Sequence, residues 1–173
     1  YHIISQIGYM IMGLAIYTPL AIAGAIFFTI HNMIAKTNTF LISGVINKLQ
    51  GTFYLKNVGG LYRRQPFLAI LFFVPAMALA GIPPLSGFFG KIMLLKAGFD
   101  SRAYLITAVA IYTGILTLYS MIKIWNEAFL KKDPQEQREE PYKKAGWAEL
   151  LPSILLGLAS IAIGLFAAYV FDF

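Results

Sequence analysis

The sequence predicts an all-α fold: a polytopic membrane helix bundle of about six transmembrane segments, including one discontinuous helix. Three observations support this prediction. Hydrophobic residues make up 58% of the 173 residues, more than the roughly half that is usual in soluble domains. They come in long runs rather than in periodic faces, which suits helices that cross a bilayer. One run is interrupted by Pro83-Pro84, and adjacent prolines break any helix that passes through them.

The predicted spans follow the apolar runs in order and make residues 1–173 a single membrane domain: 2–18, 20–48, 66–82, 85–98, 103–130 and 150–171. The weakly polar residues of the first span share one helical face, which is typical of packing between helices. In the last span, Gly157, Ser160 and Gly164 favour close helix packing. The last span indicates no function.

The second span carries one polar stripe with Lys36 at its centre. The stripe repeats every three or four residues and consists of Thr29, Asn32, Lys36, Thr39 and Ser43. A polar stripe inside a membrane helix faces the bundle interior or water rather than lipid. Lys36 lies about 18 Å from the nearer end of the span at 1.5 Å per residue, too far for its ammonium group to reach the interface. We therefore predict a functional buried lysine.

His31 lies one residue away from this stripe, so it is rotated away from Lys36. A lone histidine in such a position either packs as a hydrogen-bonded core residue or carries protons. The residue pattern leaves both interpretations open.

Two polar loops separate the spans, residues 49–65 and residues 131–148. In the first, the strand-like residues 52–55 and the turn-forming Gly59-Gly60 predict a short hairpin. The second is highly charged and is expected to be solvated, with little structure. Three predicted crossings between the loops would put them on opposite sides of the membrane. The second loop has more basic residues and is therefore predicted to be cytoplasmic.

The discontinuous helix is predicted at Gly81–Lys91, between the third and fourth spans. Its glycines allow close approach of backbones, and Lys91 follows in apolar sequence. A charge near the bilayer centre costs roughly 2.5–3.5 kcal/mol on insertion scales, so Lys91 needs water, a partner or a changed proton affinity. Transporters build ion sites from broken helices of this kind.

The fifth span ends with Lys123 and Glu127, which are spaced i and i+4, so that opposite charges can meet. Trp125 beside them indicates the membrane interface. Lys123 is accordingly either a half-buried exit group or an ordinary interfacial lysine, and both interpretations stay open.

Several classes of function are excluded by composition. With no cysteine, the sequence holds no disulfide and no thiolate metal site, and its two histidines have no carboxylate near them. It contains no nucleotide-binding loop and no nucleophile–base pair. The net charge of +6 is concentrated in the loops, as expected for membrane topology rather than nucleic-acid binding. We expect a transport function rather than an enzymatic one, without metal or other cofactor.

Proton relay through buried lysines is the chemistry that remains. A desolvated ammonium group releases its proton more readily, and such groups, joined by water and hydroxyls, can pass protons along. Like charges also couple the occupancy of neighbouring stations. The predicted stations are Lys36, Lys91, His31 and Lys123, with Lys123 toward the cytoplasm. The supporting polar path consists of Asn32, Thr39, Ser43 and Ser86.

Several motifs, in order along the chain, resemble antiporter-like membrane subunits, the proton-pumping subunits of respiratory complex I and of Mrp-type Na⁺/H⁺ antiporters. They are Ser5-Gln6-Ile7-Gly8-Tyr9-Met10, the Lys36 helix, Gly59-Gly60-Leu61 before Pro66, and Pro83-Pro84-Leu85-Ser86-Gly87-Phe88-Phe89-Gly90-Lys91. The runs His31–Gly44 and Leu118–Ile124 are most similar to the D-type branch of the Mrp family.

The resemblance implies the C-terminal part of a longer subunit built from two inverted repeats. Lys36 would be the central-channel lysine and Lys91 the terminal lysine of the second half-channel. The loop 49–65 would be extracytoplasmic and 131–148 cytoplasmic. Many relatives have histidine four residues before the central lysine, where this sequence has Asn32, which cannot be protonated near neutral pH. The glutamate–lysine pair of the family's first half is not in this sequence.

The resemblance also implies a function. The chain would be a proton-translocating part of a multi-subunit Na⁺/H⁺ antiporter in the bacterial inner membrane, with other subunits, lipid, H⁺ and Na⁺ as its partners and no nucleic acid. The alternative is the homologous pump subunit of a respiratory NADH dehydrogenase or membrane hydrogenase. A third hypothesis is a structural scaffold whose lysines pair with carboxylates of a neighbouring subunit.

Overall fold

The computed structural model describes residues 2–133 and 145–170, and every regular element among them is helical. The elements are α1 (His2–Ile16), α2 (Pro19–Gln50), η1 (Leu55–Asn57), α3 (Leu61–Arg64), α4 (Pro66–Ala80), α5 (Ser86–Asp100), α6 (Tyr104–Trp125), η2 (Asn126–Leu130) and α7 (Trp147–Val170). The all-α prediction is confirmed. Most of the charged segment predicted at 131–148 lies outside the described residues.

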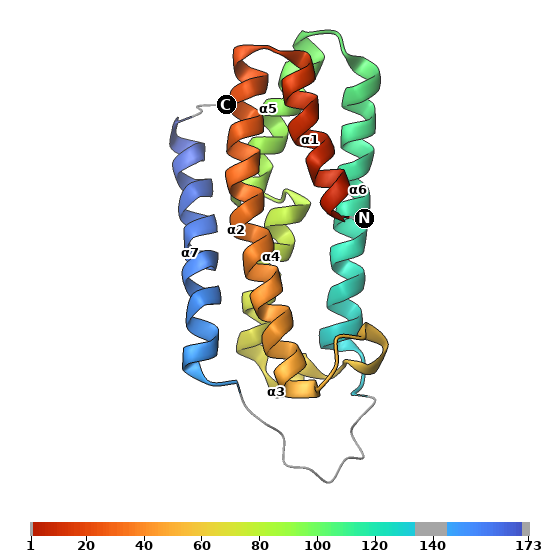
Figure 1. The fold of residues 1–173 in the computed structure, drawn as a ribbon, viewed down its shortest axis with the longest axis vertical. Helices are drawn as coiled ribbons and strands as arrows, with labels where there is room; N and C mark the ends of the chain where they lie inside the picture. Colours follow the sequence, from red (N-terminus) through yellow and green to blue (C-terminus); the bar gives the residue numbers. More distant parts are fainter. Residues whose placement is uncertain (1, 134–144, 171–173) are drawn as a thin grey trace.

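The helices form an elongated bundle around α2, which contacts α1, α4, α5 and α7 (Figure 1). At 1.5 Å per residue, the 32 residues of α2 extend about 48 Å, enough to cross a membrane. Three helices are long and apolar enough to span on their own: α2, α6 continued through η2, and α7. Their outward side chains are large and apolar, as lipid requires; Leu105 is 82% exposed.

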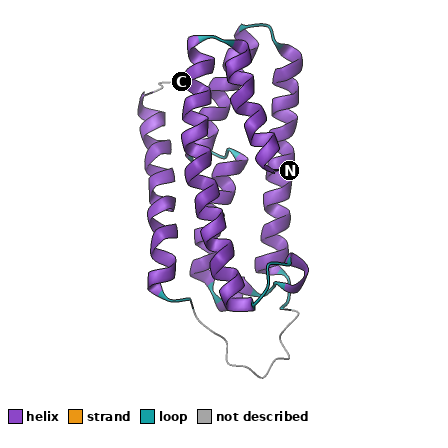
Figure 2. Ribbon diagram, viewed as in Figure 1, coloured by secondary structure: helices purple, strands orange, loops and turns teal. Residues whose placement is uncertain are grey.

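Helices α4 and α5 form the two halves of one crossing, joined by a loop at mid-height of the bundle (Figure 2). Each has 15 residues, or about 22 Å, so neither spans a bilayer of about 30 Å alone. The predicted discontinuous helix is confirmed. It gives the bundle an irregular stretch of backbone at membrane depth, which is tolerated only where protein or a polar path surrounds it.

Two apolar clusters pack the bundle on either side of this break. One joins α2, α4, the end of α6 and α7, with Ala35, Leu68 and Phe129 among its buried members. The other joins α1, α2 and α5 around Tyr9, Phe28 and Leu94. The break therefore lies between two well-packed regions that hold its ends in place.

Both polar loops lie at the same end of the bundle, so the prediction of opposite sides is wrong. The Gly60 N–H donates to the Lys131 carbonyl at 2.6 Å, and Arg64 pairs with Asp133 at 2.9 Å. The physical reason is that α4 and α5 together cross once, which leaves two crossings between the loops instead of three. The expectation that the loops 49–65 and 131–148 face opposite compartments is therefore also wrong. The described basic residues of the two loops lie at this one end: Lys56, Arg63, Arg64, Lys131 and Lys132. The positive-inside rule assigns such an end to the cytoplasm.

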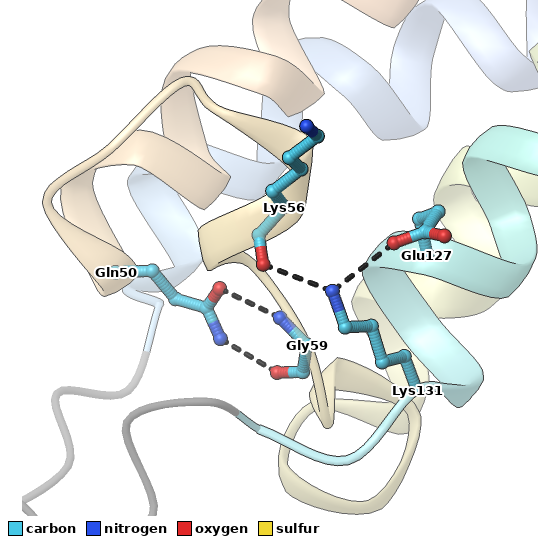
Figure 3. Close-up of polar contacts among 5 residues, drawn as sticks. All are labelled: Gln50, Lys56, Gly59, Glu127 and Lys131. Atoms are coloured by element: carbon cyan, nitrogen blue, oxygen red, sulfur yellow. Dashed lines mark hydrogen bonds and ion pairs between the residues drawn. The ribbon is translucent and has the colours of Figure 1, made fainter.

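The first loop is also not a hairpin. Residues 52–54 have no regular structure and η1 follows them. Gln50 closes the loop instead: its amide nitrogen donates to the Gly59 carbonyl at 2.7 Å, and its amide oxygen accepts from the Gly59 N–H at 3.1 Å (Figure 3). A lone pair of strands is marginal in water, whereas a buried side-chain amide satisfies both backbone groups directly.

Candidate functional site

The break between α4 and α5 follows from local chemistry. Gly81 ends α4 with a φ of +85°, a conformation that glycine adopts without strain. Its N–H bonds the carbonyls of Met77 and Ala78 at 3.0 and 3.1 Å, and the Ile82 N–H also bonds Met77 at 3.1 Å. The following Pro83-Pro84 has no N–H to continue the helix. Helix α5 then begins at Ser86.

Lys91 completes the end of α4. Its ammonium group donates to the carbonyls of Leu79 and Ala80 at 2.9 and 3.0 Å. Long helical side chains point back toward their helix N-terminus, so Lys91 reaches the break from the second turn of α5. Backbone donors thus satisfy two of the last four residues of α4, and Lys91 satisfies the other two. The carbonyl end of a helix also attracts positive charge.

The surroundings of Lys91 are dipoles rather than a carboxylate. The residue is only 7% exposed, and its Nζ lies 5.4 Å from the centre of the Tyr9 ring, a geometry that attracts a cation. The ion pairs Lys48–Glu149, Arg64–Asp133 and Lys131–Glu127 lie elsewhere in the described bundle, so none of them fixes the charge of Lys91.

This arrangement suits both protonation states of Lys91. A neutral amine has two N–H groups, which match the two carbonyls, and an ammonium has a third. Loss of one proton therefore need not leave the α4 carbonyls without donors. The third N–H can be transferred while the side chain stays in place.

Two glycines allow the close approach that this geometry needs. A Cβ at Gly81 would lie 2.9 Å from Cδ of Lys91. A Cβ at Gly87 would overlap the Ala78 carbonyl oxygen and lie 2.7 Å from Nε2 of His31. Any larger residue would push α5 away from α4 or from α2.

His31 joins the break from α2. Its Nδ1 lies 2.8 Å from the Ser86 hydroxyl, which lies 3.0 Å from the Ser160 hydroxyl of α7. His31 is 1% exposed, and its Nε2 has no hydrogen-bond partner. Three helices thus meet in one buried polar chain. Sequence reasoning assigned Ser160 to helix packing only; its spacing with Gly157 and Gly164 was the available signal.

Lys36 lies in the predicted stripe, on a different face of α2 from His31, and is half-buried. The hydroxyls of Thr29 and Thr39 bond carbonyls of their own helix at 2.7 and 2.9 Å. Thr39 and Ser43 line a cavity of about 220 Å³ beside the first loop. The stripe therefore leads from Lys36 toward the end of the bundle that carries both loops.

Asn32 and His2 lie near these groups. Asn32 is buried, and its side-chain oxygen has no hydrogen-bond partner. His2, at the start of α1, is within electrostatic range of both Lys36 and Lys91. Sequence reasoning gave His2 no role; the folding of α1 against α2 and α5 brings it near the lysines.

Lys123 stands apart from this group. It is exposed, and Glu127 pairs with Lys131 at 3.1 Å, so the expected Lys123–Glu127 contact is wrong. Glu127 has lysines four residues away on both sides. Lys131 prevails because it lies beside the first loop, where it also bonds the Lys56 carbonyl at 2.9 Å (Figure 3).

The polar face of α6 turns toward α1. Thr113, Thr117 and Ser120 line a pocket of about 460 Å³ with His2 and Ser5. Gln6 of α1 donates to the Thr117 hydroxyl at 3.3 Å. This face offers a polar surface on the α1–α6 side of the bundle.

Comparison with known proteins places this chain among membrane proteins. Residues 1–117 match the family described as NADH:quinone oxidoreductase/Mrp antiporter, transmembrane. The chain belongs to this family. Among relatives, it is 46% identical over 173 residues to the D-type Na⁺/H⁺ antiporter subunit of Alkalihalophilus pseudofirmus, covering 100% of this chain. It is 36% identical over 165 residues to the D-type subunit of Bacillus subtilis, covering 95% of this chain.

Two solved structures agree with the fold. A chain of the Mrp complex from Dietzia superposes with a TM-score of 0.87 at 31% identity, over 98% of this chain and 39% of that one. A chain of an archaeal membrane-bound sulfane sulfur reductase superposes with a TM-score of 0.85 at 28% identity, over 92% of this chain and 26% of that one. The present chain spans about a third of the length of the curated antiporter subunits, 35% and 33%. As a family member it is a multi-pass membrane protein.

Proposed function

We propose that this chain forms a proton half-channel of a multi-subunit Na⁺/H⁺ antiporter of the Mrp type. The observation that carries the proposal is Lys91, held at a helix break by two carbonyls and by no carboxylate among the residues that the structure describes. The likeness of the chain to D-type subunits of bacterial antiporters supports transport as the function, in a bacterial cell membrane and with other subunits as partners.

In this mechanism, Lys91 is the station that loads and releases a proton. Loading gives the ammonium with three N–H groups, and release leaves the amine bonded to Leu79 and Ala80. The proton moves to or from water and the neighbouring polar groups, and no covalent bond other than N–H or O–H changes. Lys36 with Asn32, Thr39 and Ser43 supplies one polar route.

The other proposed members of the relay are His31, Ser86 and Lys123. His31 and Ser86 are hydrogen-bonded to each other next to the break, and we assign them to the same path as Lys91. Lys123 is exposed, and a relay role for it requires a continuation through the polar face of α6 or through an adjacent subunit.

The test measures ΔpH-driven Na⁺/H⁺ exchange in membrane vesicles that contain the whole complex. Lys91→Ala and Lys36→Ala should lower exchange by at least about tenfold, or about 1.4 kcal/mol, while the complex still assembles. Lys96→Ala is the matched control, because Lys96 lies on the same helix but is exposed, and it should retain exchange. Normal exchange in both Lys91→Ala and Lys36→Ala would refute the proposal.

A pump subunit of a respiratory complex is the second candidate, favoured by the TM-score of 0.85 with the archaeal sulfane sulfur reductase complex. Redox subunits that co-purify in mild detergent would support it. Loss of assembly, rather than loss of exchange, in the lysine variants would instead support the scaffold hypothesis.

A further inference from the structure

A second set of buried polar groups lies between α2 and α7, toward the loop end from His31 and Ser160. It consists of Asn38 on α2, which is 1% exposed, and Ser153 on α7, which is 0% exposed. Both polar atoms of the Asn38 amide and the Ser153 hydroxyl have no hydrogen-bond partner. Each residue lies seven positions from His31 or Ser160 on its own helix, which places it on the same helical face.

The contacts of α7 show where these groups point. Ser153, Gly157, Ser160 and Gly164 are spaced by four and three residues and so share one face. A Cβ at Gly157 would lie 3.7 Å from Nδ2 of Asn38, and one at Gly164 would lie 2.8 Å from the Ser86 backbone nitrogen. The Asn38 amide therefore faces the small residues of α7.

The polar series continues to the end of the bundle that carries both loops. Glu149, one helical turn before Ser153, pairs with Lys48 of α2. The side chain of Lys48 is 67% exposed and that of Glu149 is 29% exposed. From Lys48–Glu149 through Ser153 and Asn38 to His31–Ser86–Ser160, polar groups recur along one helix–helix contact.

Energetics indicate what fills the middle of this contact. A buried polar group without a partner is costly to maintain, and Asn38 and Ser153 bring three such atoms to one interface. Larger apolar residues would remove that cost. An amide and a hydroxyl offer both donors and acceptors, and a buried water typically makes about three hydrogen bonds to such groups.

We propose that water molecules occupy the α2–α7 contact at Asn38 and Ser153 and carry protons between the loop end and the His31–Ser86–Ser160 chain. This path is separate from the Lys36 stripe, which faces another side of α2. The transfer of protons by this water rests on the proposed transport function; the presence of water does not.

The accessibility of introduced thiols tests whether water is present at positions 38 and 153. Residues 1–173 contain no cysteine, so Asn38→Cys and Ser153→Cys each add one thiol to this part of the subunit. Labelling is measured in membrane vesicles that hold the complex, with the complex without the added thiol as background. The labelling of both thiols by a small methanethiosulfonate ammonium reagent is compared with Ala69→Cys, equally buried within the apolar cluster. Because the reagent reacts with a thiolate formed in water, we expect labelling at least about tenfold faster at positions 38 and 153. Rates equal to that of Ala69→Cys would refute the proposal.

Na⁺/H⁺ exchange in vesicles tests whether protons move through the contact at Asn38 and Ser153. Asn38→Leu and Ser153→Ala should slow ΔpH-driven exchange at least about fivefold, whereas Ser153→Thr, which keeps the hydroxyl, should stay near the wild-type rate. Full exchange in Asn38→Leu and Ser153→Ala would refute a proton path here even where labelling is fast. Normal exchange in both Lys91→Ala and Lys36→Ala, with fast labelling at position 153, would instead refute the proposed proton relay through the lysines and leave the water in place.

Discussion

Gly87→Ala offers a sharp test of the geometry at the helix break. In an unobstructed helix, alanine stabilises relative to glycine by about 0.5–1 kcal/mol. At position 87 the added methyl overlaps the Ala78 carbonyl oxygen and lies 2.7 Å from Nε2 of His31. Overpacking usually costs about 1–3 kcal/mol, and a backbone carbonyl cannot rotate away. The net expectation is a loss of about 1–2 kcal/mol.

The matched control is Gly44→Ala, because a Cβ at Gly44 meets nothing within 4 Å. The assay is the thermal midpoint of the purified complex in detergent, together with exchange in vesicles. Gly87→Ala should melt below wild type and lose exchange, because α5 must move away from the carbonyls that hold Lys91. Gly44→Ala should melt at or slightly above wild type. A Gly87→Ala complex as stable and active as Gly44→Ala would show that the close contact at the break is wrong.

Two further predictions concern the loop end. The first uses two exposed positions, one in each polar loop: Lys56→Cys and Lys132→Cys. Both thiols should react with a membrane-impermeant maleimide added on the same side of the membrane, and that of Arg102→Cys with maleimide added on the opposite side. Labelling of positions 56 and 132 from opposite sides would contradict the single α4–α5 crossing. Gln50→Leu removes two bonds to Gly59 and should cost about 1–3 kcal/mol, seen as faster proteolysis between residues 51 and 60. Lys56→Ala is the control and should leave proteolysis unchanged, because Lys56 bonds Lys131 through its backbone carbonyl rather than its side chain. Equal proteolysis of Gln50→Leu and wild type would contradict the role of the two Gln50–Gly59 bonds.

Local chemistry explains which features could be predicted from sequence. Hydropathy marks the spans because lipid offers no hydrogen bonds to a polar side chain or backbone group. The break at Pro83-Pro84 is predictable because proline lacks an N–H wherever it occurs. A lysine in apolar sequence can be singled out because placing its charge in lipid is costly. The helical character, the discontinuous crossing and the candidate Lys91 all follow from such arguments.

The number of membrane crossings could be determined only from the folded chain. A run of 15 apolar residues is short for a span and long for a loop, and hydropathy does not reveal that α4 and α5 stack end to end. The error in sidedness followed directly from counting them as two. Likewise, the i, i+4 rule allows Glu127 to pair with either Lys123 or Lys131, and only the position of the first loop selects Lys131.

The sequence by itself determined that this is a membrane bundle with a proline break and a lysine beside it, because those properties belong to single residues and their neighbours. The tertiary structure decided what the lysine and His31 touch. The carbonyls of Leu79 and Ala80 are 12 and 11 positions from Lys91, and the bonds of Ser86 to His31 and Ser160 cross 55 and 74 positions. Contacts of that separation depend on how whole helices pack, which the spacing of residues within one helix does not specify.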